Sequence, residues 1–193
     1  MALQDLLGKD SAGVLVGGAN ILIGAKTSNG AAGTLFNAGY LASPPSLNNT
    51  QERTKIYAEQ EFSPVADFIT AVENGIDAEL LQNNLQNMRL ATGQVAAALT
   101  GAANGALLVF NNASDESCQV QLVVPGPGTG TTHAGTKIDT YTYWNCRVSQ
   151  SGPIKFDKKG AQIIPVHISI LPDSTIAGSP EFVKGLYGNR GLA

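Results

Sequence analysis

The sequence predicts a mainly β protein, an antiparallel β-barrel or β-sandwich with one short α-helix at about residues 82–92 and several long loops. Three observations predict this class. Several segments alternate apolar and polar residues with the period of two that a half-buried strand requires. Only one segment keeps the spacing of an amphipathic helix, and glycine is abundant, at 22 of 193 residues. A chain of this length can bury one core, so we expect a single domain over residues 1–193.

The first sixty residues predict strands separated by glycines and by one long loop. We expect an extended segment at about residues 1–13, and the following GVLVGGANILIGAK predicts one or two strands broken by glycine. The polar tract Asn37–Glu52 predicts a long loop. The next segment, RTKIYAEQEF (residues 53–62), returns to the alternation of a strand.

The middle of the chain fits either one long helix or strands followed by a short helix. Leu81, Leu85 and Met88 keep helical spacing, and Gly93 is a suitable residue to end a helix. The preceding FITAVENGIDAEL contains Asn74-Gly75, a dipeptide typical of a tight hairpin turn. We therefore expect two strands that turn at Asn74-Gly75 and a helix restricted to about Gln82–Thr92.

Alternating segments continue in the C-terminal half. ESCQVQLVV (residues 116–124) and TKIDTYTYWNCRVS (residues 136–149) predict strands, and the glycine-rich Pro125–Gly135 between them predicts a loop too long for a tight hairpin. In the second strand one face is expected to consist of Ile138, Thr140, Thr142, Trp144, Cys146 and Val148. The other face is expected to consist of Asp139, Tyr141, Tyr143, Asn145 and Arg147.

The last clear strand is IIPVHISIL, which ends in a Pro-Asp turn. Its even positions from Ile164 to Ile170 are apolar, which predicts one buried face. Pro165 cannot donate a backbone hydrogen bond, so it is expected at the start of the strand or on a sheet edge. His167 is expected on the polar face of an edge strand, exposed to solvent or to a neighbour.

The composition excludes several classes of function. The formal charge is −3 and only 14% of residues are charged, so a strongly basic phosphate-binding face is not expected. No apolar run has membrane-spanning length, and the N-terminus lacks the pattern of a secretory signal. The sequence therefore predicts a soluble chain without a membrane partner. Cys118 and Cys146 are expected as free thiols in a reducing compartment.

No catalytic, cofactor-binding or metal site is predicted. GPGTGTTHAGTK only faintly resembles a phosphate-binding loop, because the required Gly-Lys-Ser/Thr spacing is absent and no helix follows. His133 and His167 are the only histidines, and neither has a second ligand type nearby in the sequence. Trp144 lies in the middle of a strand, where tryptophan is more often core than a ligand platform.

Taken in order, these segments resemble the tail tube (major tail) proteins of tailed bacteriophages. YAEQEFSPVADFITAVENG followed by AELLQNNLQNMRLATG looks like the strands and the single helix of that family. TYTYWNCRVSQSGPIKFDKKGAQIIPVHISILPDST is similar to its closing hairpin. The resemblance spans about Ile56–Asp173 and is weak over the first fifty residues.

The resemblance implies a structural virion protein without enzyme activity or cofactor. Family members form six-fold rings that stack into a hollow tube through which the genome leaves the capsid. The implied partners are further copies of the chain, the tape measure protein, tail tip or baseplate proteins, terminator proteins and, in contractile tails, a sheath. Double-stranded DNA would pass without specific binding. The implied location is the virion tail, after assembly in the host cytoplasm.

Two sets of residues are candidates for these roles. Odd positions of one alternating segment share a face, which predicts a lumen-facing set at Glu59, Glu61, Asp67, Glu73, Asp77 and Glu79 unless the turn at Asn74-Gly75 breaks the register. The alternative for these carboxylates is that they form salt links or a solvated outer surface. Candidates for contacts between subunits are Tyr40, Pro44, Pro45, Pro127, His133, Pro165 and His167.

Three other classes of protein compete with this interpretation. The nearest is the inner tube of a contractile injection system that delivers protein. The second is a β-sandwich module for glycan binding or adhesion, which would use the 125–135 loop and Trp144. The third is a hydrolase, which lacks a nucleophile–base constellation in the sequence.

Overall fold

The computed structural model describes residues 19–28, 31, 33–57, 63–100, 106–110, 116–128, 136–154, 162–176 and 188–192. The strands are β1 (Asn20–Ala25), β2 (Leu35–Asn37), β3 (Ser46–Tyr57), β4 (Pro64–Leu80), β5 (Leu99–Thr100), β6 (Leu107–Leu108), β7 (Cys118–Gly128), β8 (Thr136–Gln150), β9 (Ile164–Leu171) and β10 (Gly188–Leu192). The helices are α2 (Leu85–Ala91) and the 3-10 turns η3 (Ala96–Ala98) and η4 (Ser174–Ile176). The predicted class, mainly β with one short α-helix, is confirmed for these residues.

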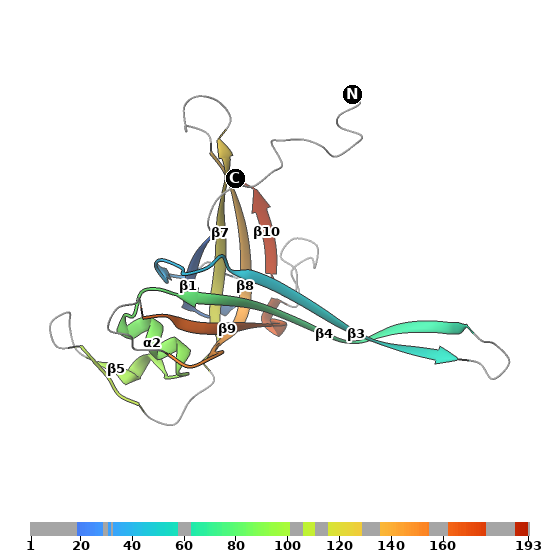
Figure 1. Cartoon of the computed structure of the whole chain (residues 1–193), viewed down its shortest axis with the longest axis horizontal. Coiled ribbons are helices and arrows are strands. Elements are labelled where there is room, and N and C mark those ends of the chain that lie inside the picture. The colour runs from blue at the N-terminus through green and yellow to red at the C-terminus, as the bar shows by residue number, and fades with distance from the viewer. Residues whose placement is uncertain are drawn as a thin grey trace.

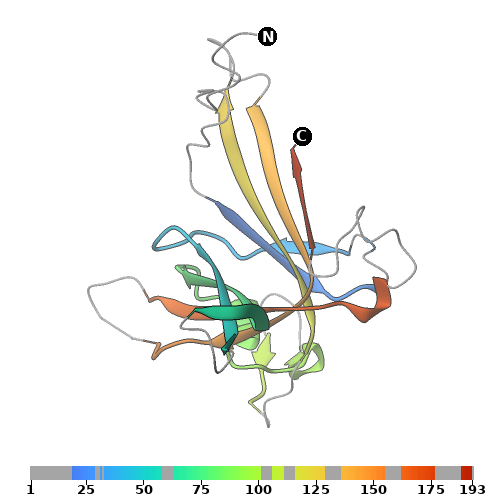
Figure 2. The same cartoon turned by 90° about the vertical axis from the view of Figure 1, so that its right-hand side faces the viewer.

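Eight strands form one antiparallel sheet in the order β2–β1–β7–β8–β9–β4–β3, and β10 pairs with β8 off this path. The first part of β8 pairs with β10 and the second part pairs with β9. Strands on the two sides of β8 cross each other, so the sheet folds over into a sandwich-like body (Figures 1 and 2). It does not close into a barrel, because β2 and β3 are its terminal strands in the described part of the chain.

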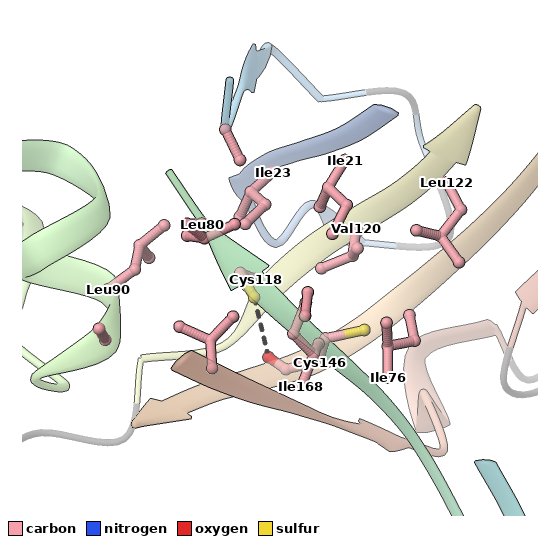
Figure 3. Packing of buried hydrophobic residues seen from close by; sticks show 14 of the residues in the cluster. Ile21, Ile23, Ile76, Leu80, Leu90, Cys118, Val120, Leu122, Cys146 and Ile168 are labelled. Carbon is pink, nitrogen blue, oxygen red and sulfur yellow. Dashed lines mark hydrogen bonds between the residues drawn. The ribbon is translucent and has the colours of Figure 1, made fainter. Parts of the chain in front are cut away.

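The core lies between β1 and β7 on one side and β4 and β9 on the other. Figure 3 shows Ile21 and Val120 on the first pair facing Ile76 and Ile168 on the second. All four side chains are buried completely. Burying an aliphatic side chain of this size contributes about 1.5–3 kcal/mol, so this cluster is the main source of stability.

The alternation of β9 is as predicted. Its even positions from Ile164 to Ile170 are buried, and its odd positions are partly exposed. Pro165 is the second residue of the strand, and its carbonyl accepts a hydrogen bond from Ser151 N at 3.1 Å. Because the N–H and C=O of a strand residue point to the same side, the missing N–H falls just beyond the end of β8.

His167, in contrast, does not lie on an edge strand. β9 pairs with β4 on one side and with β8 on the other, so it is an interior strand of the sheet. The prediction of an edge was wrong because alternation reports which face is buried, and an interior strand of a sheet with one exposed face has the same pattern.

The helix α2 begins and ends as its sequence indicates. The side chain of Asn84 caps its first turn, accepting from Asn87 N at 2.7 Å. Gly93 follows the last turn with φ +66°, a conformation that favours glycine, and ends the helix as predicted. The helix is shorter than the expected 82–92, because Asn84 takes the capping position.

The turn expected at Asn74-Gly75 is absent. β4 runs without interruption from Pro64 to Leu80, and Gly75 pairs with Asn48 of β3 and Ser169 of β9. A Cβ atom at Gly75 would lie 2.7 Å from His167 Cε1. The glycine therefore permits close approach of a neighbouring side chain, which is a second use of glycine inside strands.

Two expected loops are in part strands. Ser46–Glu52 belongs to β3, and residues 125–128 belong to β7. Every residue of β3 is exposed, and its polar first part, Ser46–Glu52, shows no alternation that would have predicted a strand. Residues 53–57 lie within the strand predicted at residues 53–62. Residues 129–135 of the second loop and the expected extended segment at 1–13 lie outside the described residues.

A β-bulge changes the predicted faces of β8. Cys146 pairs with Cys118 and Tyr143 pairs with Val120, so two residues of β8 lie opposite Gln119 alone. The first half of the strand is therefore shifted by one residue. Tyr141 and Tyr143 pack against the core, while Trp144 is buried on the opposite face.

Candidate functional site

The first candidate site is the outer face of one part of the eight-stranded sheet. It is formed by β3, β4, β9 and the second half of β8, on the side opposite the core. We call it the polar face and define it by the residues that the register places there: Asn48, Thr50, Glu52, Glu73, Asp77, Glu79, Asn145, Arg147, Ser149, Pro165, His167 and Ser169.

The polar face carries an excess of negative charge. Its carboxylates are Glu52, Glu73, Asp77 and Glu79, and Arg147 is its permanent cation. A polyanion would be repelled by this surface, since phosphate binding depends on clustered Lys and Arg.

The six predicted lumen carboxylates do not all share one face. Glu73, Asp77 and Glu79 do, as their odd numbers predict. Asp67 does not, because an extra residue of β4 at Thr70 shifts the register against β3, and Asp67 pairs with Lys55 on the opposite face. Its carboxylate lies 3.1 Å from Arg53 Nη1. Glu59 and Glu61 lie outside the described residues.

A hydrogen-bonded group occupies the middle of the polar face. His167 Nδ1 lies 2.6 Å from Asp77 Oδ1, and Asn48 donates to Asp77 Oδ2 at 2.5 Å. The His167 ring lies over Gly75, so it is fixed by contact below and by the carboxylate beside it. A hollow of about 480 Å³ opens next to the ring, and Thr50, Glu73 and Ser169 are among the residues that line it.

A second, smaller hollow of about 240 Å³ brings together residues predicted for two different roles. Pro44 and Pro165, candidates for subunit contacts, line it together with Asp77 and Glu79. Ser43 donates to Glu79 at 2.9 Å at its edge.

The other candidates for subunit contacts are spread over the surface. Tyr40 is 77% exposed, and Pro45 is half-buried in the segment that directly precedes β3. Pro127 lies in β7, with its side chain outside the described part of the structure, and His133 is also outside it.

The second candidate site is a projecting ribbon that the sequence did not predict. We call it the arm and define it as Gln51–Tyr57 of β3 with Pro64–Val72 of β4. The pairing of β4 with β9 stops at Asn74, so beyond this point the described residues form only two paired strands. Figure 1 shows the arm extending to the right, away from the body.

The arm is exposed and unusually apolar. Its exposed large apolar side chains are Ile56, Tyr57, Val65, Phe68, Ile69 and Val72. The register places Phe68 with Thr54 on one face of the ribbon and Ile69 with Arg53 on the other, so both faces are partly apolar. The sequence does contain a sign of two apolar faces, because Phe68 and Ile69 are adjacent apolar residues that interrupt the alternation. We did not interpret it in this way, because we expected this segment to end in a turn at Asn74-Gly75.

Two buried ionic groups stabilise the body. Asp173 accepts hydrogen bonds from Thr175 N and Oγ1 at 3.0 and 2.8 Å, and Lys26 Nζ lies 3.0 Å away. Burial alone would raise the pKa of Asp173, but the hydrogen bonds from Thr175 and the Lys26 ammonium outweigh it and hold this pKa below its ordinary value. Nearby, next to the backbone hydrogen bond between Lys26 N and Ser117 O, Arg89 of α2 pairs with Glu116 at 2.5 Å.

The two cysteines lie opposite each other on β7 and β8. Cys118 Sγ donates to the carbonyl oxygen of Cys146 at 3.3 Å, and both thiols are free and buried. Burial and, to a smaller extent, the Glu116 carboxylate raise the pKa of Cys118 to about 12. Such thiols are poor nucleophiles and poor metal ligands at neutral pH.

Further chemistry has little support in the part of the chain that the structure describes. No group of three or more His, Cys, Asp or Glu side chains that could hold a metal ion occurs there. Trp144 is only 7% exposed, so it offers no stacking platform to a sugar ring.

Comparisons with known proteins do not identify the chain. No protein-family model matches the sequence, and no curated protein matches it. The described helices are all too short or too polar to cross a membrane.

Proposed function

We propose that the chain is a structural virion protein that assembles as stacked six-membered rings into the tail tube of a bacteriophage and forms the conduit for its genome. Further copies of the chain are its main partner. The tape measure, tail tip or baseplate and terminator proteins, with a sheath in contractile tails, are the other proposed partners, and the virion tail is its location.

The arm is the observation that carries this proposal. A two-stranded ribbon is at best marginally stable in water. Here both of its outer edges lack a partner within the described residues, and both faces carry exposed apolar side chains. Unpaired edges and apolar surface of this kind are normally covered by another chain. Burial between copies of the same chain would supply this cover.

The polar face suits the wall of a channel for DNA. A channel must let a polyanion slide, so it needs few cations and many hydrated polar groups. The face offers carboxylates, amides and hydroxyls, with Arg147 as its permanent cation. Screening acts over about 8 Å at physiological salt, so charges on the wall would still act on DNA that fills the channel.

A glycan-binding module is less well supported. It would use Trp144 as an exposed platform, and this side chain is buried on the far side of β8. The alternative inner tube of an injection system shares the proposed architecture and differs in its cargo.

Self-association of the purified chain tests the proposal. Sedimentation velocity over a wide concentration range, with negative-stain electron microscopy, should show rings or tubes, if necessary after addition of the tail tip proteins. A shortened chain, in which Asn-Gly joins Arg53 directly to Ile69, keeps the base of the ribbon and a compatible turn. It should fold and remain monomeric. A wild-type chain that stays monomeric under all these conditions would contradict the proposal.

A further inference from the structure

Cys118 and Cys146 lie directly opposite each other on neighbouring strands. The register pairs their Cα atoms across β7 and β8, and both side chains belong to the buried core. Directly opposite residues of an antiparallel pair have Cα atoms about 4.5 or 5.5 Å apart, within the range of about 4.4–6.8 Å found across disulfide bonds. The backbone therefore holds the two residues at a separation that a disulfide accepts.

Both strands of this pair lie in the interior of the sheet. Cys118 is also paired with Ala25 of β1, and Cys146 is also paired with Ile170 of β9. Neither cysteine can move away from the other without disturbing a second strand pairing. The closeness of the two residues is therefore a fixed property of the fold.

One thiol is turned toward its partner and the other is turned away. Cys118 Sγ donates to the carbonyl oxygen of Cys146 at 3.3 Å, whereas Cys146 Sγ donates to Tyr143 O at 3.9 Å on its own strand. Figure 3 shows the sulfur of Cys146 pointing away from Cys118. A cysteine sulfur has three staggered positions about the Cα–Cβ bond. Rotation of Cys146 about this bond would turn its sulfur toward Cys118 and leave the paired strands in place.

We propose that Cys118 and Cys146 are a latent disulfide, a dithiol that closes into a bond between β7 and β8 when a small disulfide oxidant is present. The thiolate of one cysteine attacks a sulfur of the oxidant, which forms a mixed disulfide and releases one small thiol. The other cysteine then attacks the protein sulfur of the mixed disulfide and releases the second small thiol. The cysteines lose two electrons to the oxidant, and their two protons pass to the released thiols.

Burial makes this closure slow. The thiolate is the reactive form, and burial raises the pKa of Cys118 to about 12, so a local opening must first expose one of the thiols. The second step is fast by comparison, because the other cysteine is the direct neighbour of the mixed disulfide. A reducing compartment would keep the pair open, and an oxidising one would close it. Closure depends on the fold alone and is independent of the proposed function.

Oxidation of the folded chain tests the latent disulfide. The wild type, purified under reducing conditions, is incubated without denaturant in oxidised glutathione at pH 8 and sampled over several days. Peptide mapping by mass spectrometry should show a two-proton deficit that links the peptides of Cys118 and Cys146 within one chain. The bond would enclose residues 119–145, and a loop of this length is expected to raise the midpoint of thermal unfolding by about 7–14 °C. Reduction with dithiothreitol should reverse this shift.

Cys118→Ala and Cys146→Ala are the matched controls, and circular dichroism establishes that each is folded. Each keeps one thiol, so it should form at most a glutathione adduct, without a shift of the midpoint. The wild type decides the outcome even if a control does not fold, since its own reduced form is the reference. A folded wild type that stays free, accumulates only glutathione adducts or links two copies would overturn the proposal. A closed chain that unfolds at a lower temperature than the reduced chain would also overturn it, because the fold would then not hold the pair ready to bond.

Discussion

Replacing Gly75 by alanine tests the packing of the polar face. Gly75 lies in the interior of β4, beneath the ring of His167. Its φ is not in the positive range, so alanine can adopt the backbone conformation without strain. The new methyl group would however lie 2.7 Å from His167 Cε1 and 3.0 Å from Nε2. Ordinary contacts begin at about 3.4 Å, so the ring must retreat by about 0.7 Å.

This retreat would lengthen the 2.6 Å contact between His167 Nδ1 and Asp77 Oδ1 to as much as about 3.3 Å and so weaken it. Loss of one such hydrogen bond costs about 0.5–1.5 kcal/mol of folding free energy. The change from glycine to alanine recovers about 0.4–1 kcal/mol by restricting the unfolded chain. We therefore expect Gly75→Ala to destabilise the wild type by no more than about 1 kcal/mol. In a His167→Ala background the same change should stabilise the fold by about 0.4–1 kcal/mol.

Urea unfolding of the four proteins in this cycle, followed by tryptophan fluorescence, measures the coupling between the two positions. We expect a coupling free energy of about 0.5–1.5 kcal/mol. If Gly75→Ala changes stability equally in both backgrounds, within about 0.3 kcal/mol, the ring does not depend on the glycine and the reasoning is refuted.

Three further predictions concern the body and the channel. Asp173→Asn should cost about 1–3 kcal/mol at pH 7. Folding lowers the pKa of Asp173, so the stabilisation by its carboxylate is fully present above the unfolded-state pKa near 3.9 and is lost as pH falls through the folded-state pKa. The difference in unfolding free energy between wild type and Asp173→Asn, measured by urea unfolding, should therefore shrink at acid pH. Cys118 and Cys146 should resist alkylation at pH 8 in the folded protein and react at once in guanidinium; mass spectrometry that shows a two-proton deficit linking their peptides would contradict free thiols. Glu73→Lys with Glu79→Lys should leave assembly intact and slow DNA ejection, most strongly at low salt, whereas the matched Gln variants should not; ejection at the normal rate would exclude these carboxylates from control of passage.

Alternation was a reliable guide where a strand meets the core without a β-bulge. β9 is the clearest example, because every even residue from Ile164 to Ile170 is buried. The helix was also predictable, since Asn84 and Gly93 provide local capping signals. These features depend on residues close together in the sequence.

The errors arose where local signals have two physical meanings. Asn-Gly is typical of a tight turn, yet Gly75 serves close packing of His167, a contact from a strand some ninety residues away. The bulges at Thr70 and opposite Gln119 move Asp67 and Trp144 to faces that simple parity does not predict. Bulges depend on pairing between strands, so a single strand does not reveal them.

The arm was missed for a related reason. Alternation predicted a strand at residues 53–62, but it also implied one buried face, and β3 has none. β3 is a strand because it pairs with β4. The first half of β4 carries exposed apolar residues, which do not contribute to the core of a single copy. Three of the six predicted carboxylates share one face: Glu73, Asp77 and Glu79. They follow the bulge at Thr70 in the sequence, and in that part of β4 odd-numbered residues lie on one face as predicted.

The most direct test of the account is a cryo-electron microscopy reconstruction of the assembled chain. The account predicts stacked six-fold rings around an open channel, with Glu73, Asp77, Glu79 and Arg147 on the channel wall and the arm packed on the adjacent copy. A solid filament without a channel, or a tube whose polar face points outward while another surface lines the channel, would contradict it.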